Sequence, residues 1–418
     1  MDTSAAERST TVYLCGRRID MLPELLSSNL CSLREGQLRY AFSVIWTLDA
    51  EANIEKAQEM VDGTKIHRDN ISLSLRNLLF LSRQLKSRRR TMGALELASS
   101  EIRFDVDRET GTPLKVQEKQ HLETMSMVEE FMLLANISVA EKILSAYPDC
   151  AILRRHPTPG RLSFKPLIGS CGFKLNVDTS KELAKSLDEV EQQCRQSGGR
   201  HNPMVARMLR MLATRCMTQA VYFAAGTVSR DHYLHYGLAV NVYTHFTSPI
   251  RRYADVMVHR LLAALLEIEE MHPNMLDRKR LIRQAENMNR RHRHAQYASR
   301  ASVLLNTFLM VKECPEKSLA AIVIGISSNG IKVMVPKFGL ESVIYLNRGG
   351  DGTIRQNVTW TQQRMAEFCA SNGISLFREV KVSVAVVEHK DQRKRIDLKL
   401  VDPVVDGLSI VMDCETNI

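Results

Sequence analysis

Residues 243–262 read YTHFTSPIRRYADVMVHRLL and carry the densest chemical pattern in the chain. Ser248 is of a type that caps helix N-termini, and Pro249 suits the first helical position. We therefore expect a helix to begin at Pro249, with its unpaired backbone N–H groups available to an anion. Arg251 would lie in that first turn, where a guanidinium can donate two parallel hydrogen bonds to a phosphate. The stretch predicts a phosphate-binding helix N-terminus.

The spacing downstream of Pro249 also favours a helix. Charged residues recur every four positions at Arg251, Asp255 and His259, so Asp255 is expected to hold Arg251 in place. An ordinary amphipathic helix with a solvated charged stripe fits the same residues, and the residues alone leave both interpretations open. The apolar positions that would be buried are Ile250, Ala254, Met257, Leu261, Leu265 and Leu266.

Composition bounds the class of protein. The chain has 418 residues and a net charge of +10, which suits a polyanionic partner but also a merely basic protein. Its nine cysteines include no Cys-x-x-Cys pair, which argues against a zinc site and, with an odd count, against a disulfide framework. No apolar run is long enough to span a membrane, and the first residues lack a signal-peptide core. We expect a soluble, intracellular protein without a membrane partner.

Periodicity organises the first three quarters of the chain. Helical spacing predicts three helices, over 71–90, 122–144 and 276–312. Alternation predicts a strand over 101–107, and Pro, Gly and polar residues predict loops over 156–172 and 192–203. The 276–312 helix carries an arginine stripe, which is either a lining for an RNA channel or a solvated face. The basic residues at 82–90 either complement the helix dipole or contact RNA.

After Pro315 the period changes to two, which predicts strands. Five short strands with a Lys-Phe-Gly-Leu-Glu segment between the second and third resemble the S1-type OB barrel, a small RNA-binding module. Phe338 and Tyr345 are candidates for stacking on bases or for the barrel core. The predicted strands cover 320–326, 331–336, 340–346, 380–388 and 395–400.

Several motifs, in the same order, resemble the ribonuclease II (RNB) family of 3′→5′ exoribonucleases, and most closely its eukaryotic branch, the catalytic nuclease of the exosome. The resemblance covers most of the chain and implies an α+β fold. We expect the C-terminal portion of an RNB domain, with a mixed sheet and many helices, over 1–315. An S1-type OB domain follows over 316–402, and then a tail over 403–418, packed on the surface or disordered. The motifs are TTVYLC at 10–15, MLPELLSSNLCSL at 21–33, MVEEFMLLANI at 127–137, ATRCM at 213–217, AQYA at 295–298 and the 243–262 stretch itself.

The resemblance also implies a function. Members of the family bind single-stranded RNA and hydrolyse it from the 3′ end with two Mg²⁺ ions, releasing nucleoside monophosphates. Arg251 matches the catalytic arginine that grips the scissile phosphate. Tyr13 matches an aromatic that stacks on the terminal base, and Glu129 a residue that contacts a ribose. Ser248 and Arg252, beside Arg251, are further candidates for RNA contact. The branch implies docking on the exosome core ring and location in the nucleus and cytoplasm.

One expected element is missing from the sequence. The family holds its metals with an Asp-x-Asp-Asp cluster upstream of the Thr-Val-Tyr-Leu motif, and this chain contains no adjacent Asp pair. Asp105 and Asp107 have a comparable spacing but fall in a predicted strand, so we assign no metal ligand. Two hypotheses remain open: part of an enzyme whose active form carries the carboxylates, or an RNA-binding protein without turnover. Gln296 stands where bacterial members carry Glu, so no acidic role is assigned there.

Overall fold

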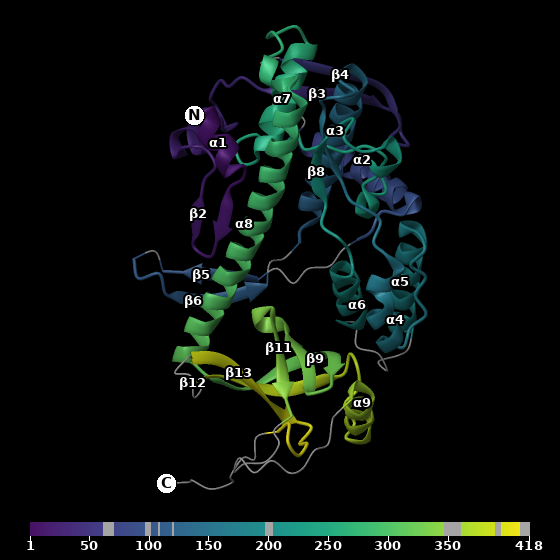
Figure 1. Ribbon diagram of the computed structural model, residues 1–418, viewed down its shortest axis with the longest axis vertical. Coiled ribbons are helices and arrows are strands. Elements are labelled where there is room, and N and C mark those ends of the chain that lie inside the picture. The colour runs from purple at the N-terminus through teal and green to yellow at the C-terminus, as the bar shows by residue number, and fades with distance from the viewer. Residues whose placement is uncertain are drawn as a thin grey trace.

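The computed structural model describes residues 1–61, 71–96, 102–107, 109–118, 121–196, 204–346, 361–388 and 394–409 (Figure 1). The helices are α1 (Asp2–Arg8), α2 (Ile71–Met92), α3 (Glu123–Ala146), α4 (Arg161–Ser170), α5 (Ser180–Gln196), α6 (Met204–Arg215), α7 (Tyr253–Leu265), α8 (Arg278–Glu313) and α9 (Gln362–Ser371). The strands before the barrel are β1 (Val12–Leu14), β2 (Arg17–Ile19), β3 (Phe42–Leu48), β4 (Ile54–Val61), β5 (Ile102–Val106), β6 (Pro113–Glu118), β7 (Ile152–Arg155) and β8 (Val221–Ala224). The barrel strands are β9 (Glu316–Ser327), β10 (Gly330–Val335), β11 (Leu340–Tyr345), β12 (Glu379–Glu388) and β13 (Lys394–Asp402).

The α+β class and the C-terminal barrel are confirmed. The barrel strands form one antiparallel sheet in the order β11-β10-β9-β12-β13, and its two edge strands also contact each other. The earlier strands form the antiparallel pairs β1-β2, β3-β4, β5-β6 and β7-β8, where we expected one mixed sheet. Helices or long connections separate each pair from the next, so within the described residues the pairs remain separate.

The first hydrophobic core lies around α3, α7 and the β7-β8 pair. The side chains of Val139 and Ile143 on α3 pack with Val258 and Leu261 on α7, and all four are fully buried. Helix α8 closes the core from the other side and runs from this upper part of the molecule down to the barrel (Figure 1). Its buried residues lie toward its two ends, over 281–288 and 306–311, and the two ends pack in different cores.

The S1 barrel is built into its neighbours. Ile322 and Phe377 belong to the core that α4, α5 and α6 form, and the rings of Phe377 and Phe173 lie 6.5 Å apart. On the other side, Val311 of α8 is buried in the barrel's own core. The aromatic ring of Phe338 is 1% exposed and belongs to that core, whereas Tyr345 is 63% exposed and remains a candidate for stacking.

Several predicted boundaries are wrong. The expected loop 156–172 contains α4, because Phe164 and Leu167 pack into the second core despite Pro166. Helix α5 extends through Gln196 because Cys194 is buried against the same core, and residues 197–203 lie outside the described residues. Helix α9 was not predicted. Part of the expected tail is packed: Val405 and Leu408 are buried in the barrel core, and 410–418 lie outside the described residues.

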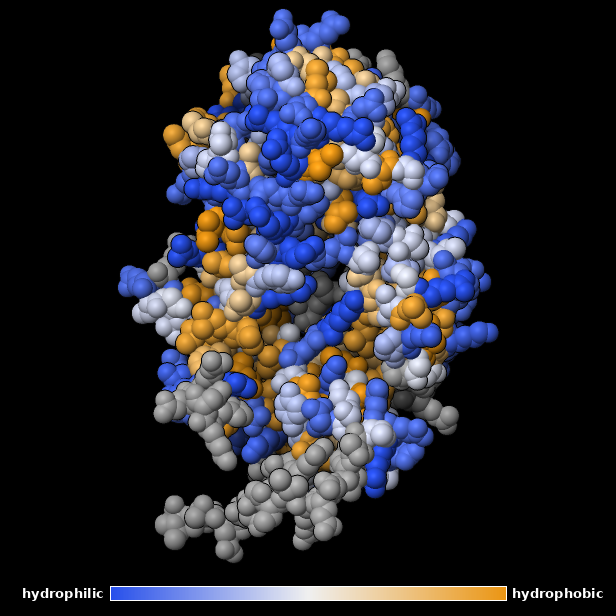
Figure 2. All heavy atoms as spheres, in the orientation of Figure 1, coloured by the Kyte–Doolittle hydropathy of each residue, from blue (hydrophilic) through white to orange (hydrophobic). Residues whose placement is uncertain are grey.

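The hydropathy of the surface changes along α8. Hydrophilic residues dominate the face over its upper half, whereas hydrophobic ones gather lower on the same side, near β5 and β6 (Figure 2). Exposed apolar side chains there include Leu304 and Leu305 of α8 and Leu114 of β6. Among the described helices, none combines the length and the apolar character needed to cross a membrane.

Candidate functional site

The N-terminal motif and the Arg251 motif meet in the structure although they lie far apart in the sequence. The backbone N–H of Thr11 donates to the carbonyl oxygen of Arg251 over 3.1 Å, and the N–H of Tyr253 donates to the carbonyl oxygen of Ser9 over 2.9 Å. Thr10 and Arg252 form an antiparallel bridge between these two bonds. The strand that leads to Tyr13 is therefore hydrogen-bonded to the backbone of Arg251 and its neighbours.

This pairing corrects the predicted helix start. Helix α7 begins at Tyr253, and Arg252, not Ser248, is its N-cap residue. The bridge to Thr10 requires extended backbone at Arg252 (φ −139°, ψ 122°), which is incompatible with a helix running through it. Residues 248–251 instead form a turn, in which the N–H groups of Arg251 and Arg252 donate to the carbonyl oxygen of Ser248. Arg251 thus lies ahead of the helix.

Asp255 binds Arg252, which corrects the expected pairing with Arg251. The Nε and Nη2 atoms of Arg252 donate to the two carboxylate oxygens of Asp255 over 2.9 and 2.7 Å. The backbone N–H of Ser248 donates to the same carboxylate over 2.7 Å. Burial, the largest single effect, would lower the pKa of Arg252, but the charge and hydrogen bonds of Asp255 together with Tyr222 and Tyr243 outweigh it, and the net pKa is raised. The side chain of Asp255 is fully buried, so this pair organises the turn rather than facing a substrate.

The guanidinium of Arg251 is left available. The backbone on both sides of Arg251 is fixed, and its half-buried side chain has no ion pair or hydrogen bond with any residue that the structure describes. An anchored backbone with a free guanidinium is what a phosphate-binding arginine requires. The residue singled out from the sequence remains a candidate for phosphate binding, although it does not lie in the predicted helix.

Two other predicted contacts, Tyr13 and Glu129, are both exposed, and Gln296, which was assigned no role, lies elsewhere. Tyr13, in β1, is 48% exposed and pairs with Arg18 across the β1-β2 hairpin, so it is not a core aromatic. Glu129, on α3, is exposed, whereas the neighbouring Glu130 is buried in an ion pair with Arg89. The side chain of Gln296 accepts a hydrogen bond from Gln219 over 2.8 Å.

Sequence reasoning missed a cluster of cationic and aromatic side chains beside this turn. We call this cluster the chamber; its members are Arg154, Tyr222, His235, Tyr243, His245 and His292. The guanidinium of Arg154, on β7, stacks over the ring of Tyr222, on β8, at 4.8 Å. The hydroxyl of Tyr222 lies 2.6 Å from Nδ1 of His245, whose ring meets that of Tyr243 edge-on at 5.5 Å. The ring of His235 lies 5.3 Å from that of Tyr243. The Arg154-Arg155 pair at the end of a strand that begins with buried residues was a usable signal, because two consecutive cations in such a strand are unusual.

The histidines of this chamber are held neutral. Burial lowers the pKa of His235 to about 3, with further lowering by the charges of His156 and Arg154. Burial and then the charges of Arg154 and Arg252 lower the pKa of His292 to about 4. The pKa of His245 is lowered well below its ordinary value, again mainly by burial. The chamber's positive charge therefore comes from its arginines.

These shifted pKa values predict acid sensitivity. The unfolded histidines titrate near pH 6.5, whereas His235 and His292 bind protons in the folded state only near pH 3 and 4. Between these values the unfolded state binds more protons, so we expect stability to fall as the pH drops from 6.5 towards 4. Urea unfolding across this range measures the slope. His235→Gln should reduce it, while His294→Gln, at an exposed position on α8, should not; equal slopes for all three proteins would contradict the assignment.

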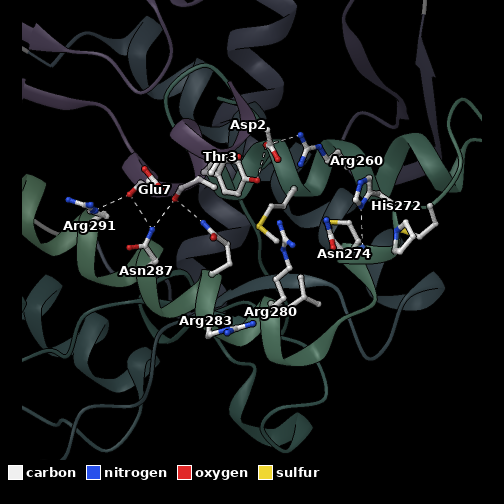
Figure 3. Close-up of a pocket in the computed structure, with 18 of the residues that line it drawn as sticks. Asp2, Thr3, Glu7, Arg260, His272, Asn274, Arg280, Arg283, Asn287 and Arg291 are labelled. Atoms are coloured by element: carbon white, nitrogen blue, oxygen red, sulfur yellow. Dashed lines mark hydrogen bonds and ion pairs between the residues drawn. The ribbon is translucent and has the colours of Figure 1, made fainter.

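A separate cavity of about 920 Å³ lies between α1, α7 and α8 (Figure 3). Arg260 of α7 donates to Asp2 over 2.8 Å, and Asn287 and Arg291 of α8 donate to carbonyl oxygens near the other end of α1 over 2.9 Å. The lining mixes arginines with carboxylates and does not include Arg251. These bonds hold α1, and with it the strand that pairs beside Arg251.

The described residues do not fit a two-metal centre. Within the described ranges, no group of three or more His, Cys, Asp or Glu side chains is placed to hold a metal ion. Asp255, the carboxylate nearest to Arg251 in the sequence, is fully buried and already accepts three donors. Magnesium prefers several oxygen ligands and retained waters, which this arrangement does not offer.

Comparison with known proteins identifies the class of protein to which this fold belongs. The profile of the RNB domain matches residues 1–58 and 50–268, and that of an S1 domain matches residues 318–398. The chain belongs to the RNB family. It is 49% identical to the probable exosome complex exonuclease RRP44 of Caenorhabditis elegans, over all of this chain and 44% of the relative. It is 43% identical to the exosome complex exonuclease RRP44 homolog A of Arabidopsis thaliana, over 96% of this chain and 44% of the relative.

Solved structures share the fold. Mycoplasma genitalium RNase R in complex with ribose-methylated single-stranded RNA superimposes with a TM-score of 0.75 at 22% sequence identity, covering 95% of this chain and 64% of that one. Because it covers 44% of each of the two relatives named above, the chain spans about half the length of the curated relatives it matches. The C. elegans alignment runs over 441 positions, more than the 418 residues of this chain, so that relative carries residues absent here.

Proposed function

We propose that the protein acts in 3′→5′ exoribonucleolytic RNA degradation and processing, and that this chain supplies the phosphate-gripping and RNA-binding part of the site. The observation that carries the proposal is Arg251: its backbone is fixed by the N-terminal strand, and its guanidinium has no partner among the residues that the structure describes. Tyr13 stacks on the terminal base and Glu129 contacts a ribose, and both side chains are exposed, as these roles require. The relatives named as exosome exonucleases support the same activity.

Ser248 and Arg252 have more indirect roles in this proposal. Arg252 is neutralised by Asp255, so it positions the turn on which Arg251 sits, and its remaining exposed edge adds a weaker contact to RNA. Ser248 closes that turn through its backbone, which leaves its hydroxyl to face the substrate. The exposed Tyr345 of the S1 barrel gives a second stacking surface for the same strand.

Mg²⁺ is the metal we propose for the reaction, held by carboxylates other than those of the described residues. Its chemistry when bound would be to activate water and to stabilise the leaving oxygen. The residues of this chain bind and orient the phosphate, stack the base and hold the strand. We further propose association with the exosome core ring, in the nucleus and cytoplasm, from the names of the relatives.

The 418-residue chain should bind a 3′-tailed single-stranded RNA and release no mononucleotide when Mg²⁺ is added. Binding should weaken with salt because phosphate contacts release counterions. Fluorescence anisotropy over a salt series measures the first property, and thin-layer separation of labelled products the second. A form that also carries the Asp-x-Asp-Asp cluster is the positive control and should release monophosphates from the 3′ end.

Two results would contradict the proposal. Rapid shortening of the RNA by the purified chain would show that the metal ligands lie within it. Failure to bind RNA at low salt would remove the RNA-gripping role. The alternative function, an RNA-binding protein without turnover, requires the cluster-bearing form to be inactive as well.

A further inference from the structure

Arg154 is a half-buried cation without a counter-ion among the residues that the structure describes. Its backbone N–H donates to the carbonyl oxygen of Tyr243 over 2.8 Å, and its guanidinium lies over the ring of Tyr222. The Nη1 atom is buried and has no hydrogen-bond partner among the described residues, while the side chain as a whole is only half-buried. A buried donor without an acceptor destabilises the fold, so its presence points to a bound group that supplies the acceptor.

Within the described residues, no carboxylate forms an ion pair with Arg154. The neighbouring side chains include His245, which contacts the Tyr222 hydroxyl under the guanidinium, and His235, whose ring lies 5.3 Å from that of Tyr243. Asp255, which belongs to the adjoining turn, is saturated by Arg252 and by the Ser248 N–H. A chamber with two arginines and one committed carboxylate repels metal ions and attracts a monoanion.

The chamber adjoins the segment that carries Arg251. The Tyr222 hydroxyl contacts His245, and the chain continues from His245 through the turn to Arg251 within six residues. The Thr244 hydroxyl donates to the carbonyl oxygen of Ile152 over 2.6 Å, which fixes this segment along β7. In the proposed arrangement, an extended RNA strand whose scissile phosphate lies at Arg251 places its next phosphate along this segment.

We propose that Arg154 forms a second phosphate subsite, binding a phosphodiester next to the one that Arg251 grips. The proposal rests on the proposed function of the chain as an RNA-binding nuclease component. The chemistry fits: a phosphodiester supplies both the missing charge and acceptor oxygens for the free Nη1, and neutral histidines supply further hydrogen bonds. The Tyr222 ring below the guanidinium holds its plane and prevents it from turning away.

Arg155 provides a matched control on the same strand. It carries the same charge and places its guanidinium over Phe223 at 5.9 Å, and its Nε is likewise buried without a hydrogen-bond partner among the described residues. It differs from Arg154 in lying on the opposite face of β7, so it tests whether an unpartnered arginine suffices without the neighbouring Arg251 turn. If only the general positive field matters, Arg154→Gln and Arg155→Gln should weaken RNA binding equally. If Arg154 contacts a phosphate, only Arg154→Gln should change the salt dependence.

The test uses the 418-residue chain and a 3′-tailed single-stranded RNA. We expect Arg154→Gln to weaken binding on the order of tenfold and to reduce the slope of log affinity against log salt by about 0.7, one single-strand phosphate contact. Arg155→Gln should leave the slope unchanged. In a second measurement without RNA, inorganic phosphate at constant ionic strength should raise the melting temperature of the wild-type and Arg155→Gln proteins but not that of Arg154→Gln.

The outcomes separate this inference from the proposed function. Wild-type binding of RNA with an unchanged slope in Arg154→Gln would overturn the subsite and leave the proposed function intact. No RNA binding by the wild type, with phosphate stabilisation that depends on Arg154, would overturn the proposed function and leave an anion site. If Arg154→Gln does not fold, Arg154→Lys replaces it: we expect the wild-type salt slope with weaker affinity, because Lys binds phosphate as a point charge. A shallower slope in Arg154→Lys would overturn the subsite.

Discussion

Replacing Arg251 with Ala in an active form of the protein should lower kcat by about 10²–10³-fold while changing RNA affinity only a few-fold. The reason is that the charge on the phosphate oxygens grows as the bond breaks, so a guanidinium stabilises the transition state more than the bound substrate. Single-turnover decay of a 3′-labelled RNA measures the rate, and anisotropy without turnover measures affinity. Arg251→Lys should fall between, because it keeps the charge and loses the two parallel donors.

Arg161→Ala is the control for this substitution. Arg161 lies on α4, 75% of its side chain is exposed, and it pairs with an exposed aspartate, so its loss should leave kcat unchanged. The folding of Arg251→Ala should also be unchanged, because the backbone of residue 251 and not its side chain makes the described contacts. Parallel losses of rate and affinity in Arg251→Ala would assign the residue to ground-state binding and contradict the role proposed for it.

Asp255→Asn should lower the free energy of unfolding by about 3–5 kcal/mol. The carboxylate of Asp255 is fully buried, and its two oxygens accept hydrogen bonds from Arg252 and from the backbone of the turn. Removing its charge leaves Arg252, only 14% exposed, without a counter-ion. Urea denaturation should show a lower midpoint with an unchanged slope, which marks a loss of stability rather than a change in the unfolded state.

An exposed pair provides the comparison. Arg83 and Glu123 form a salt bridge with side chains 61% and 58% exposed, and Glu123→Gln should cost less than about 1 kcal/mol. The double variant Arg252→Met with Asp255→Leu should regain much of the loss, since apolar residues can replace a buried ion pair. Similar costs for Asp255→Asn and Glu123→Gln would show that the buried pair does not organise the turn.

Long periodic segments allowed much of this fold to be predicted. Helices α3 and α8 bury enough regularly spaced apolar residues for their spacing to identify them, and alternation did the same for the barrel strands. Helix α4 was missed because Pro and Gly outweigh apolar residues in a local pattern, whereas tertiary packing of Phe164 decides the structure. The local spacing of apolar residues predicts a helix or strand reliably where that element buries a long face of its own.

The candidate site was predictable in identity but not in geometry. Arg251 was found from its own segment, yet the bond that fixes it comes from Thr10 and Thr11, 240 or so positions away, which no local pattern contains. The choice of Arg252 over Arg251 as the partner of Asp255 depends on that pairing, because it makes residue 252 extended. Arg154 gave no signal of its missing counter-ion, since only the folded chamber shows which charges remain unpaired.

The way the S1 barrel shares apolar residues with α4–α6 and α8 bears on how the chain is divided. Residue 316 marks a change of pattern in the sequence, but contacts such as Phe173 with Phe377 cross that boundary and bury side chains from both sides. The barrel is therefore recognisable as a separate domain in the sequence, but its folding stability depends on the neighbouring helices. The barrel and the helices that pack on it form one cooperative unit. Deleting or transplanting the barrel would therefore remove buried apolar residues from the core of those helices.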